Sequence, residues 1–365
     1  MRLTPLAESL PASVPFVGPE AQERARGASF AARLGANESV FGPSPRALAA
    51  MRDAAANGWM YGDPEARDLR EAIAAHHGIP LESVVAGEGI DGLLGYLVRL
   101  LVAPGDAVVT SAGAYPTFNY HVAGFGGALH TVPYRDDRED PEALAAKAAE
   151  VGAKLVYLAN PDNPMGSWHG AARIATLIDA LPEGTVLCLD EAYAEFALPE
   201  AIPPLDPGDA RVIRMRTFSK AHGMAGLRVG YAIGHPDLIR AFEKVRNHFG
   251  LNRVAQAGAV AALGDPDWLM EVRARVLQSR DAIAAIARTN GLEPLPSGAN
   301  FVAVDCGRDG DFARRVLAGL LERGVFVRMP GVAPLDRCIR ISCGTQADME
   351  ALGAALPDAL AAARS

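Results

Sequence analysis

Lysine is scarce in this sequence, and that scarcity limits the chemistry available to the chain. Only four of its 35 basic residues are lysines: Lys147, Lys154, Lys220 and Lys244. Lys147 lies in an alanine-rich helical pattern, Lys154 lies just ahead of a strand-like run, and Lys244 lies on a charged helix face, so we expect all three at the surface. Lys220 alone lies at the end of a strand-like run among small residues and hydroxyls, and it is therefore the candidate for a reactive amine.

Basic charge and long apolar runs are also lacking. The formal net charge is −8 at pH 7, which argues against a nucleic-acid-binding face. The best apolar run, Gly89 to Val102, is interrupted by Asp91 and Arg99 and falls short of the ~20 residues needed to span a bilayer. We therefore expect neither a nucleic acid nor a membrane as a partner.

The few cysteines lack the paired spacing of a zinc or redox site. They are Cys188, Cys306, Cys338 and Cys343, and we expect them to be reduced core residues, as in a cytosolic protein. The first ten residues contain Arg2 and Glu8 with no apolar segment between them, so a secretory signal is not predicted. These features predict a cytoplasmic protein without a bound metal.

Apolar runs of strand length alternate with helical patterns between residues 46 and 250, which predicts an α/β layer with a mostly parallel sheet. Most of these runs are nearly continuous in Val, Leu and Ile, as expected of strands covered on both faces. The predicted strands are Val84 to Ala86, Ala107 to Thr110, Leu155 to Ala159, Val186 to Leu189, Val212 to Met215 and Val229 to Ile233.

A smaller α+β domain is predicted beyond residue 250. It contains an amphipathic helix from Trp268 to Arg288, strands at Phe301 to Val304, Val325 to Arg328 and Cys338 to Ser342, a helix over about 311–323, and a final alanine-rich helix. The first 45 residues are rich in Pro and Gly and predict an extended arm. The expected division is an N-terminal arm (1–45) joining the small domain, a large domain (46–250) and a small C-terminal domain (251–365), consistent with about 150 residues per domain.

A glycine-rich turn follows the first predicted strand. Residues 87–92 read Gly-Glu-Gly-Ile-Asp-Gly, which superficially matches a dinucleotide-binding fingerprint. That fingerprint also needs an acidic residue at the end of the next strand, whereas Asp106 precedes its strand. What the pattern does predict is a helix start with free N–H groups and a positive dipole end, which suits a phosphate.

Polar residues follow two further strands and lie where open α/β sheets bind ligands. The loop 160–166 reads Asn-Pro-Asp-Asn-Pro-Met-Gly, and Asp190 to Tyr193 follow the strand that ends at Leu189. A carboxylate at such a strand end is costly unless a positive group pairs with it. These clusters, with Lys220 after the next strand, predict a site at one edge of the sheet.

These motifs span nearly the whole chain, and together they resemble the fold-type-I pyridoxal-phosphate-dependent aminotransferases, class-II group, most closely the histidinol-phosphate aminotransferase branch. The resemblance implies an α/β fold, with a three-layer large domain around a mostly parallel seven-stranded sheet and a smaller α+β domain. It implies pyridoxal 5'-phosphate as the cofactor. The motifs are Gly35-Ala36-Asn37-Glu38, Gly87-x-Gly89-x-Asp91, Pro116-Thr117-Phe118, Asn160-Pro161-x-Asn163-Pro164-x-Gly166, Asp190-Glu191-Ala192-Tyr193, Ser219-Lys220 with Gly223 and Gly226-Leu227-Arg228, and Arg340-x-Ser342-x-Gly344.

The resemblance implies roles for residues around the cofactor ring. In the family, the lysine matching Lys220 forms the internal aldimine and then moves a proton between substrate and cofactor. The carboxylate matching Asp190 faces the pyridine nitrogen and keeps it protonated. Tyr193 and Asn163 match residues that hydrogen-bond the phenolic oxygen, and Phe118 matches one that stacks on the ring.

The resemblance also implies a phosphate site and an assembly. The residues implied in phosphate binding are Gly89, Ile90, Asp91, Thr217, Ser219 and Arg228. A tyrosine like Tyr61 reaches the phosphate of the neighbouring subunit in these enzymes, so we expect a homodimer with shared active sites.

Substrate contacts are implied at both ends of the chain. Arg340 matches the arginine that grips a substrate carboxylate or an equivalent acid, and Arg328 matches a second arginine for the substrate's anionic group. Gly35 and Asn37 belong to the expected substrate contacts through their shared motif.

Four residues depart from the family pattern: Phe16, Ile90, Met165 and His222. Phe16 stands where these enzymes usually have a tyrosine whose hydroxyl helps to bind the substrate phosphate. The loss of one hydrogen bond to a charged group costs about 1.5–3 kcal/mol, which would shift substrate preference but leave the reaction type unchanged.

The residues and the resemblance predict an aminotransferase. We expect the amino donor to be histidinol phosphate or an aromatic amino acid, and the acceptor to be a 2-oxo acid such as 2-oxoglutarate. An amino-acid decarboxylase of the threonine-phosphate type stays open, because it shares this scaffold and nearly all of these motifs. A regulator built on such a domain is disfavoured, since the chain has neither a basic patch nor spare length for a DNA-binding segment.

Overall fold

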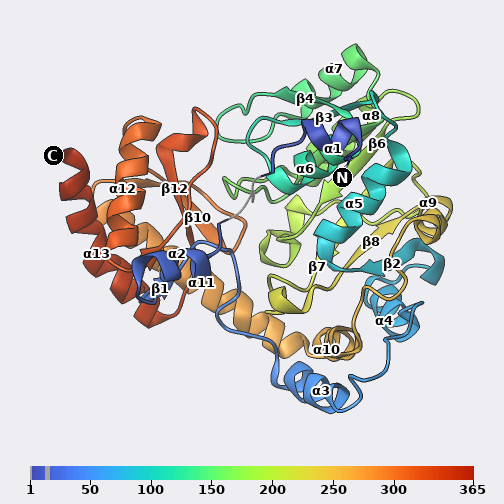
Figure 1. The fold of residues 1–365 in the computed structure, drawn as a ribbon, viewed down its shortest axis with the longest axis horizontal. Coiled ribbons are helices and arrows are strands. Elements are labelled where there is room, and N and C mark those ends of the chain that lie inside the picture. The colour runs from blue at the N-terminus through green and yellow to red at the C-terminus, as the bar shows by residue number, and fades with distance from the viewer. Residues whose placement is uncertain (1, 13–16) are drawn as a thin grey trace.

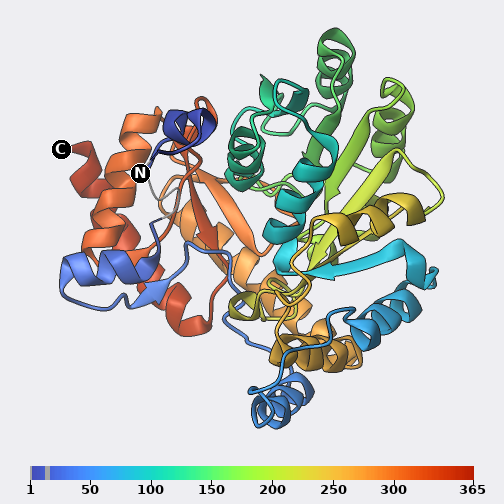
Figure 2. The same cartoon turned by 45° about the vertical axis from the view of Figure 1, so that its right-hand side comes forward.

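A seven-stranded sheet forms the centre of the computed structural model, which describes residues 2–12 and 17–365 (Figure 1; Figure 2). The strand order is β2-β8-β7-β6-β5-β3-β4, and only β8 runs antiparallel to its neighbours. This confirms the predicted α/β fold with a mostly parallel seven-stranded sheet. The strands are β2 (Val84–Gly87), β3 (Ala107–Ser111), β4 (Ala128–Val132), β5 (Leu155–Ala159), β6 (Val186–Asp190), β7 (Val212–Thr217) and β8 (Gly230–Gly234).

Helices cover both faces of this sheet and make it the middle of three layers. Leu155 and Tyr157 of β5 belong to one hydrophobic cluster, whereas Val156 and Leu158 belong to a second cluster on the opposite face. We call the first face the α5 face; it packs against α5 (Gly89–Leu101), α6 (Pro116–Gly124) and α9 (Pro236–Ala241). We call the second the α7 face; it packs against α4 (Arg67–His77), α7 (Pro141–Val151), α8 (Ala171–Ala180) and α10 (Arg253–Leu263), with α3 (Pro45–Ala55) against α10.

A second hydrophobic core lies beside the large sheet (Figure 1). Its strand β10 (Phe301–Asp305) pairs antiparallel with β12 (Cys338–Ser342) and β9 (Glu293–Pro294), while β1 (Ala32–Arg33) pairs parallel with β11 (Val325–Phe326). Leu34 follows β1 and is buried in the same core, so this part of the N-terminal arm packs with elements formed by the C-terminal third of the chain. The helices here are α2 (Pro19–Arg26), α11 (Pro266–Thr289), α12 (Gly310–Glu322) and α13 (Gln346–Arg364).

The N-terminal arm is less extended than expected. It contains α1 (Pro5–Ser9) and α2, and each begins with proline in its first turn, where proline's missing N–H costs nothing. The Thr4 hydroxyl accepts a hydrogen bond from the Ala7 N–H and caps α1. Helices this short show no apolar periodicity, so only their start signals could have revealed them.

Two other elements differ from the expectation. Strand β4 is absent from the predicted strands because it is an edge strand whose residues are mostly half-buried, and its sequence lacks a continuous apolar run. Helix α10 follows residue 250, yet its Ala255 and Ala259 pack in one cluster with Met51 of α3 and Leu69 of α4. The chain therefore continues to contribute to the large core beyond the expected boundary.

Several features of the sequence can be placed on the structure. All four cysteines are buried free thiols, as expected. No helix among the described residues is long and apolar enough to cross a membrane. Phe16, the expected departure at the substrate phosphate, lies outside the described residues.

Candidate active site

A cavity of about 640 Å³ lies where β5, β6 and β7 end, between the large sheet and the second core. Asn163, Asp190 and Lys220 follow or end three neighbouring strands and meet at this cavity, as parallel strands require. The predicted residues among its lining are Gly35, Asn37, Ile90, Asp91, Asn163, Asp190, Tyr193, Thr217, Ser219, Lys220, Arg228, Arg328 and Arg340.

Lys220 presents its amine to this cavity. The side chain follows β7, and its Nζ donates a hydrogen bond to the Asn37 carbonyl oxygen at 3.1 Å. Burial and the nearby Arg340 guanidinium lower the pKa of Lys220 to about 8. A substantial fraction of this amine is therefore neutral near pH 8, which is what a nucleophile or a general base requires. Lys154 and Lys244 are exposed and Lys147 is ion-paired with Glu150, as expected of surface lysines.

Asp190 ends β6 and lies on the α5 face of the sheet. Its two oxygens are held by different elements: the Tyr157 hydroxyl donates to Oδ2 at 2.6 Å, and the Ala192 N–H donates to Oδ1 at 2.9 Å. Burial raises the pKa of Asp190 to about 6 even though both donors favour the charged form. No guanidinium pairs with it among the described residues, so this carboxylate is suited to receive a cation from a ligand.

Asn37 connects the N-terminal arm to the centre of the site. Its Nδ2 donates to the Tyr193 hydroxyl at 3.1 Å, and its Oδ1 accepts from the Ser342 hydroxyl at 2.9 Å. Its carbonyl oxygen accepts from Lys220 and, at 3.1 Å, from Asn300 Nδ2. The backbone adopts φ of +54°, a left-handed conformation that asparagine tolerates better than most residues.

The start of α5 forms a cradle for an anion. Glu88 precedes the helix without a capping side-chain bond, so the first N–H groups remain available. The Arg228 guanidinium donates to Ser219 Oγ at 3.4 Å and to the Glu88 carbonyl at 3.3 Å. Gly89 has φ of +77°, and a Cβ there would clash with Arg228, so glycine allows the guanidinium to approach the helix start.

Two arginines from neighbouring backbone segments also line the cavity. Arg340 on β12 donates to Asn163 Oδ1 at 2.5 Å and to the Gly35 carbonyl at 3.0 Å, and burial lowers the pKa of Arg340 to about 10. Arg328 exchanges backbone hydrogen bonds with Arg340 and donates to the Val17 carbonyl at 2.7 Å. The cavity thus has one wall that carries two guanidinium groups.

Two cofactor contacts expected within this chain, Gly89 and Phe118, are not among the cavity-lining residues. Phe118 does not line the cavity; it is fully buried, and its ring stacks on Tyr157 with centroids 4.5 Å apart. Tyr115, three residues earlier at the start of α6, lines the cavity instead. Because α6 begins at Pro116, Phe118 lies in the first turn of this helix, and its side chain packs into the hydrophobic cluster on the α5 face. Tyr61 is expected to reach the neighbouring subunit, so its position outside the lining of this chain's own cavity, where it is 77% exposed, does not test that expectation.

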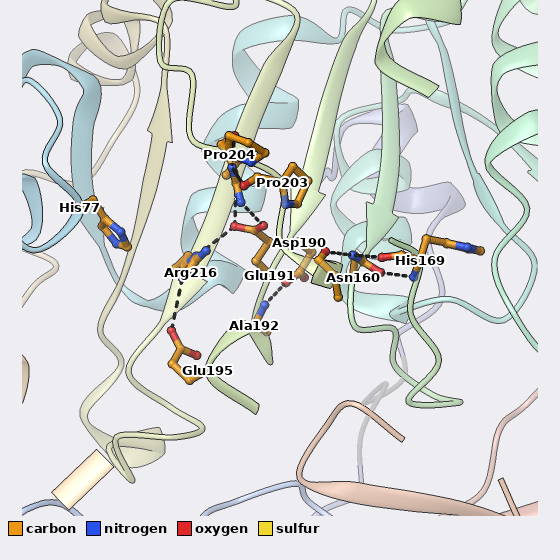
Figure 3. A network of polar contacts seen from close by, with 12 residues as sticks. His77, Asn160, His169, Asp190, Glu191, Ala192, Glu195, Pro203, Pro204 and Arg216 are labelled. Atoms are coloured by element: carbon orange, nitrogen blue, oxygen red, sulfur yellow. Dashed lines mark hydrogen bonds and ion pairs between the residues drawn. The ribbon is translucent and has the colours of Figure 1, made fainter. Parts of the chain in front are cut away.

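Glu191, the residue after Asp190, lies on the α7 face and, unlike Asp190, is paired with arginine side chains (Figure 3). The carboxylate of Glu191 is fully buried and accepts hydrogen bonds from Arg214 and, at 2.9 Å, from Arg216. Burial alone would raise its pKa, but the Arg216 and Arg214 guanidinium groups hold the pKa of Glu191 below its ordinary value. This cluster lies outside the cavity lining and stabilises the end of β6 from behind.

A further buried carboxylate lies behind the cavity. Asp162 accepts a hydrogen bond from the Tyr134 hydroxyl at 2.8 Å and from the Met165 N–H at 3.1 Å. Burial raises the pKa of Asp162 to about 7. Neither Asp162 nor Tyr134 is among the cavity-lining residues, so this pair holds the loop after β5 without facing a ligand.

Three polar side chains of the cavity wall are missed by the sequence motifs. Tyr115 directly precedes the quoted Pro116 motif. Tyr157 lies in the middle of β5, where only strand alternation could have placed it on the same face as Asp190. Asn119 lines the cavity with a buried Oδ1 that has no hydrogen-bond partner, and no sequence signal marks it.

The residues present fit pyridoxal 5'-phosphate. The cradle at α5 offers N–H groups, hydroxyls and Arg228 for a phosphate, Asp190 offers an uncompensated carboxylate for a ring nitrogen, and Lys220 offers an amine of lowered pKa. Among the described residues, no group of three or more His, Cys, Asp or Glu is arranged to hold a metal ion.

Comparisons with known proteins agree with this geometry. The family model described as "Aminotransferase class I and II" matches residues 32–356. Histidinol-phosphate aminotransferases of Anaeromyxobacter sp. (strain Fw109-5) and Moorella thermoacetica are 38% and 35% identical, covering 96% and 94% of this chain and 97% and 89% of theirs.

A solved structure extends the likeness to three dimensions. Histidinol-phosphate aminotransferase from Sinorhizobium meliloti, in complex with pyridoxal-5'-phosphate, superposes with a TM-score of 0.96 at 56% identity, covering 99% of this chain and 98% of that one. With the family match over most of the chain, this shows that the chain belongs to the class I and II aminotransferases and uses pyridoxal 5'-phosphate for transamination.

Proposed function

We propose that the amino donor is histidinol phosphate and that the acceptor is a 2-oxo acid such as 2-oxoglutarate. The observation that carries this proposal is the pair Arg328 and Arg340, which line the same cavity as the amine of Lys220. A phosphate-bearing donor and a dicarboxylic acceptor both need cationic partners beyond the reacting carbon. The names of the relatives support the same donor.

The proposed role of Lys220 is to attack a carbonyl carbon and to move a proton at the substrate Cα. With a pKa of about 8, a minor fraction of this amine is neutral at physiological pH, and that fraction is available for both tasks. The Asn37 carbonyl, 3.1 Å from Nζ, orients the amine before it reacts.

The remaining residues would hold the cofactor. We assign the phosphate to the start of α5 with Thr217, Ser219 and Arg228, and the phenolic oxygen to Asn163 and Tyr193. We assign the ring nitrogen to Asp190, and one ring face to Tyr115 in place of Phe118. When bound, the cofactor supplies an electrophilic carbon and a ring that withdraws electrons from the substrate Cα.

A panel of amino donors tests the proposed substrate. With 2-oxoglutarate present, histidinol phosphate should give glutamate with a kcat/KM well above that of aromatic amino acids. Arg328→Gln should lower kcat/KM for histidinol phosphate about 10- to 100-fold, because a hydrogen bond to a charged group contributes about 1.5–3 kcal/mol, and should affect an uncharged aromatic donor far less. Equal losses for both donors, or preference for an aromatic donor, would contradict this assignment. Carbon dioxide release without a keto product would instead indicate a decarboxylase.

We also propose that two copies assemble with shared active sites. Trp59, Tyr61 and Phe249 are 81%, 77% and 53% exposed, and the rings of Tyr61 and Phe249 lie 4.8 Å apart. Large aromatic side chains grouped at a surface are typical of an interface. Sedimentation should give a dimer of 38.3 kDa chains, and Tyr61→Ala should weaken both dimer and cofactor binding. A monomer with full activity would contradict the proposal.

For the domain organisation, we propose to keep the expected division with one change. Helix α10 is assigned to the large domain because it packs against α3 and α4, so the small domain would begin at α11 and include the arm from α2 onward. The four free thiols support a reducing compartment such as the cytoplasm.

A further inference from the structure

Tyr157 lies between the cavity and the core of the large sheet. Its side chain is fully buried on β5, yet it belongs to the cavity lining. On its inner side the ring stacks on Phe118 with 4.5 Å between centroids and 19° between planes. A ring packed in this way has one orientation, so its hydroxyl has a fixed position.

The Tyr157 hydroxyl donates its hydrogen bond to Asp190. A phenol has a single proton to donate, and here it goes to Asp190 Oδ2 at 2.6 Å. The other carboxylate oxygen receives the Ala192 N–H at 2.9 Å. Two donors from different segments therefore fix the plane of the carboxylate, and both favour its charged form.

We propose that Tyr157 is a positioning residue for transamination: its hydroxyl orients Asp190 and keeps it ionised toward the cofactor ring nitrogen, while Phe118 fixes the Tyr157 ring. This inference rests on the proposed role of Asp190. In this proposal the buried Phe118 supports the Tyr157 ring and does not itself stack on the cofactor.

Other titratable groups also face Asp190, and they affect the pKa of its carboxyl group together with Tyr157. Lys220 favours the charged carboxylate, whereas Glu191 disfavours it. The remaining groups that interact with Asp190 are Tyr115 at the start of α6, Glu139 before α7, Cys188 on β6 and Tyr193 after β6. Among all of these, Tyr157 is the side chain whose hydrogen bond to Asp190 lowers the pKa of that carboxyl group, so its removal should raise that pKa.

Binding of two cofactors to the apoenzyme measures this effect without turnover. Pyridoxal phosphate can donate a ring N–H to Asp190, whereas its 1-deaza analogue carries carbon at that position and cannot. The quantity to measure is the ratio of their dissociation constants between pH 5.5 and pH 9. Protonation of Lys220 affects both ligands alike, so it cancels in the ratio.

Tyr157→Phe should keep the ring packing and lose only the hydroxyl. We expect the pH at which the preference for pyridoxal phosphate disappears to rise by about one unit, and the preference at pH 6.5, just above the Asp190 pKa of about 6, to fall about threefold. Binding of the analogue should change less than twofold. An unchanged ratio and an unchanged midpoint would overturn the proposal.

Two further variants complete the design. Tyr134→Phe removes the same type of bond from Asp162, a buried carboxylate outside the cavity lining, and should leave the ratio unchanged; an equal shift there would also overturn the proposal. Asp190→Asn should abolish the preference at every pH. If it does not, the proposed role of Asp190 is wrong, and this is distinct from a failure of Tyr157 alone.

Phe118→Leu provides an independent approach if Tyr157→Phe does not fold. The smaller side chain releases the Tyr157 ring without removing its hydroxyl, so the midpoint should shift in the same direction by less than one unit. A fully retained midpoint in this folded variant would overturn the positioning role.

Discussion

Asp190 and Glu191 are consecutive acids at the end of one strand, and they lie on opposite faces of the sheet. Asp190 faces the cavity on the α5 face with neutral donors only, and burial raises its pKa to about 6. Glu191 on the α7 face is held by Arg214 and Arg216, which keep its pKa below the ordinary value (Figure 3).

The two faces therefore have different roles: charges on the α7 face stabilise the end of the strand, whereas charges on the α5 face are available for reaction. On the α7 face the charges are compensated within the chain, so they hold the strand end in place. On the α5 face Asp190 has no guanidinium partner among the described residues and Lys220 has a lowered pKa, so both are suited to charges and electrophiles brought by a ligand. Three substitutions and the dependence on pH test whether the two faces differ in this way.

Lys220→Ala should have the largest effect, and on activity alone. It removes the proposed nucleophile and base, so kcat should fall by at least about 10⁴-fold. The free energy of unfolding should stay the same or rise, because burial of this amine is unfavourable. Borohydride treatment with cofactor should leave no covalent adduct; an adduct in this variant would show that another amine reacts.

Glu191→Gln should have the next largest effect, on stability. Two buried guanidinium groups would lose their carboxylate, which costs about 3–5 kcal/mol of unfolding free energy. Denaturant unfolding measures this loss. Glu142→Gln is the matched control, because its pair with Arg173 is exposed and should contribute less than about 1 kcal/mol. Similar losses in the two variants would remove the distinction between the faces.

Asp190→Asn should show the reverse pattern. Loss of the cofactor-facing charge should lower kcat/KM about 10²- to 10³-fold, or about 2.7–4 kcal/mol. The unfolding free energy of the apoenzyme should change little, since an amide is less costly to bury than an uncompensated carboxylate. A large loss of stability would place Asp190 with Glu191 among the structural acids.

The smallest expected effect is the pH dependence of cofactor capture. Below the Lys220 pKa of about 8 the amine is protonated and unreactive. The rate of covalent capture by the apoenzyme should therefore rise about tenfold per unit at pH 6–7 and level off above pH 8. Arg340→Gln should move the midpoint upward, because the Arg340 guanidinium lowers the Lys220 pKa. A midpoint that does not move would exclude this cause.

The sequence allows the main sheet and much of the cavity to be predicted, because both depend on local signals. Strands β5 and β6 are nearly continuous apolar runs and β7 begins as one, and the polar residues that end these strands must meet at one edge of a parallel sheet. Lys220 could be singled out because so few lysines compete with it. The motif resemblance supplied the residues distant in sequence, such as Asn37 and Arg340, which line the same cavity.

The remaining features depend on packing that the sequence does not encode locally. The direction in which the Phe118 side chain points depends on where α6 begins. Tyr157 has the pattern of an ordinary core residue, and only its hydrogen bond to Asp190 distinguishes it. Helix α10 follows the apparent boundary, but its small residues fit between α3 and α4. Edge strand β4 is defined by its pairing with β3 rather than by its own pattern.

The distribution of lysines has a practical consequence for peptide mapping. A protease that cleaves after lysine makes four cuts in this chain and so yields five fragments, because the lysines are Lys147, Lys154, Lys220 and Lys244. A molecule fixed to the cavity lysine would block one cut and join residues 155–220 to 221–244 in a single heavier peptide. The mass of that peptide would report which amine has reacted and what fraction of the enzyme has reacted.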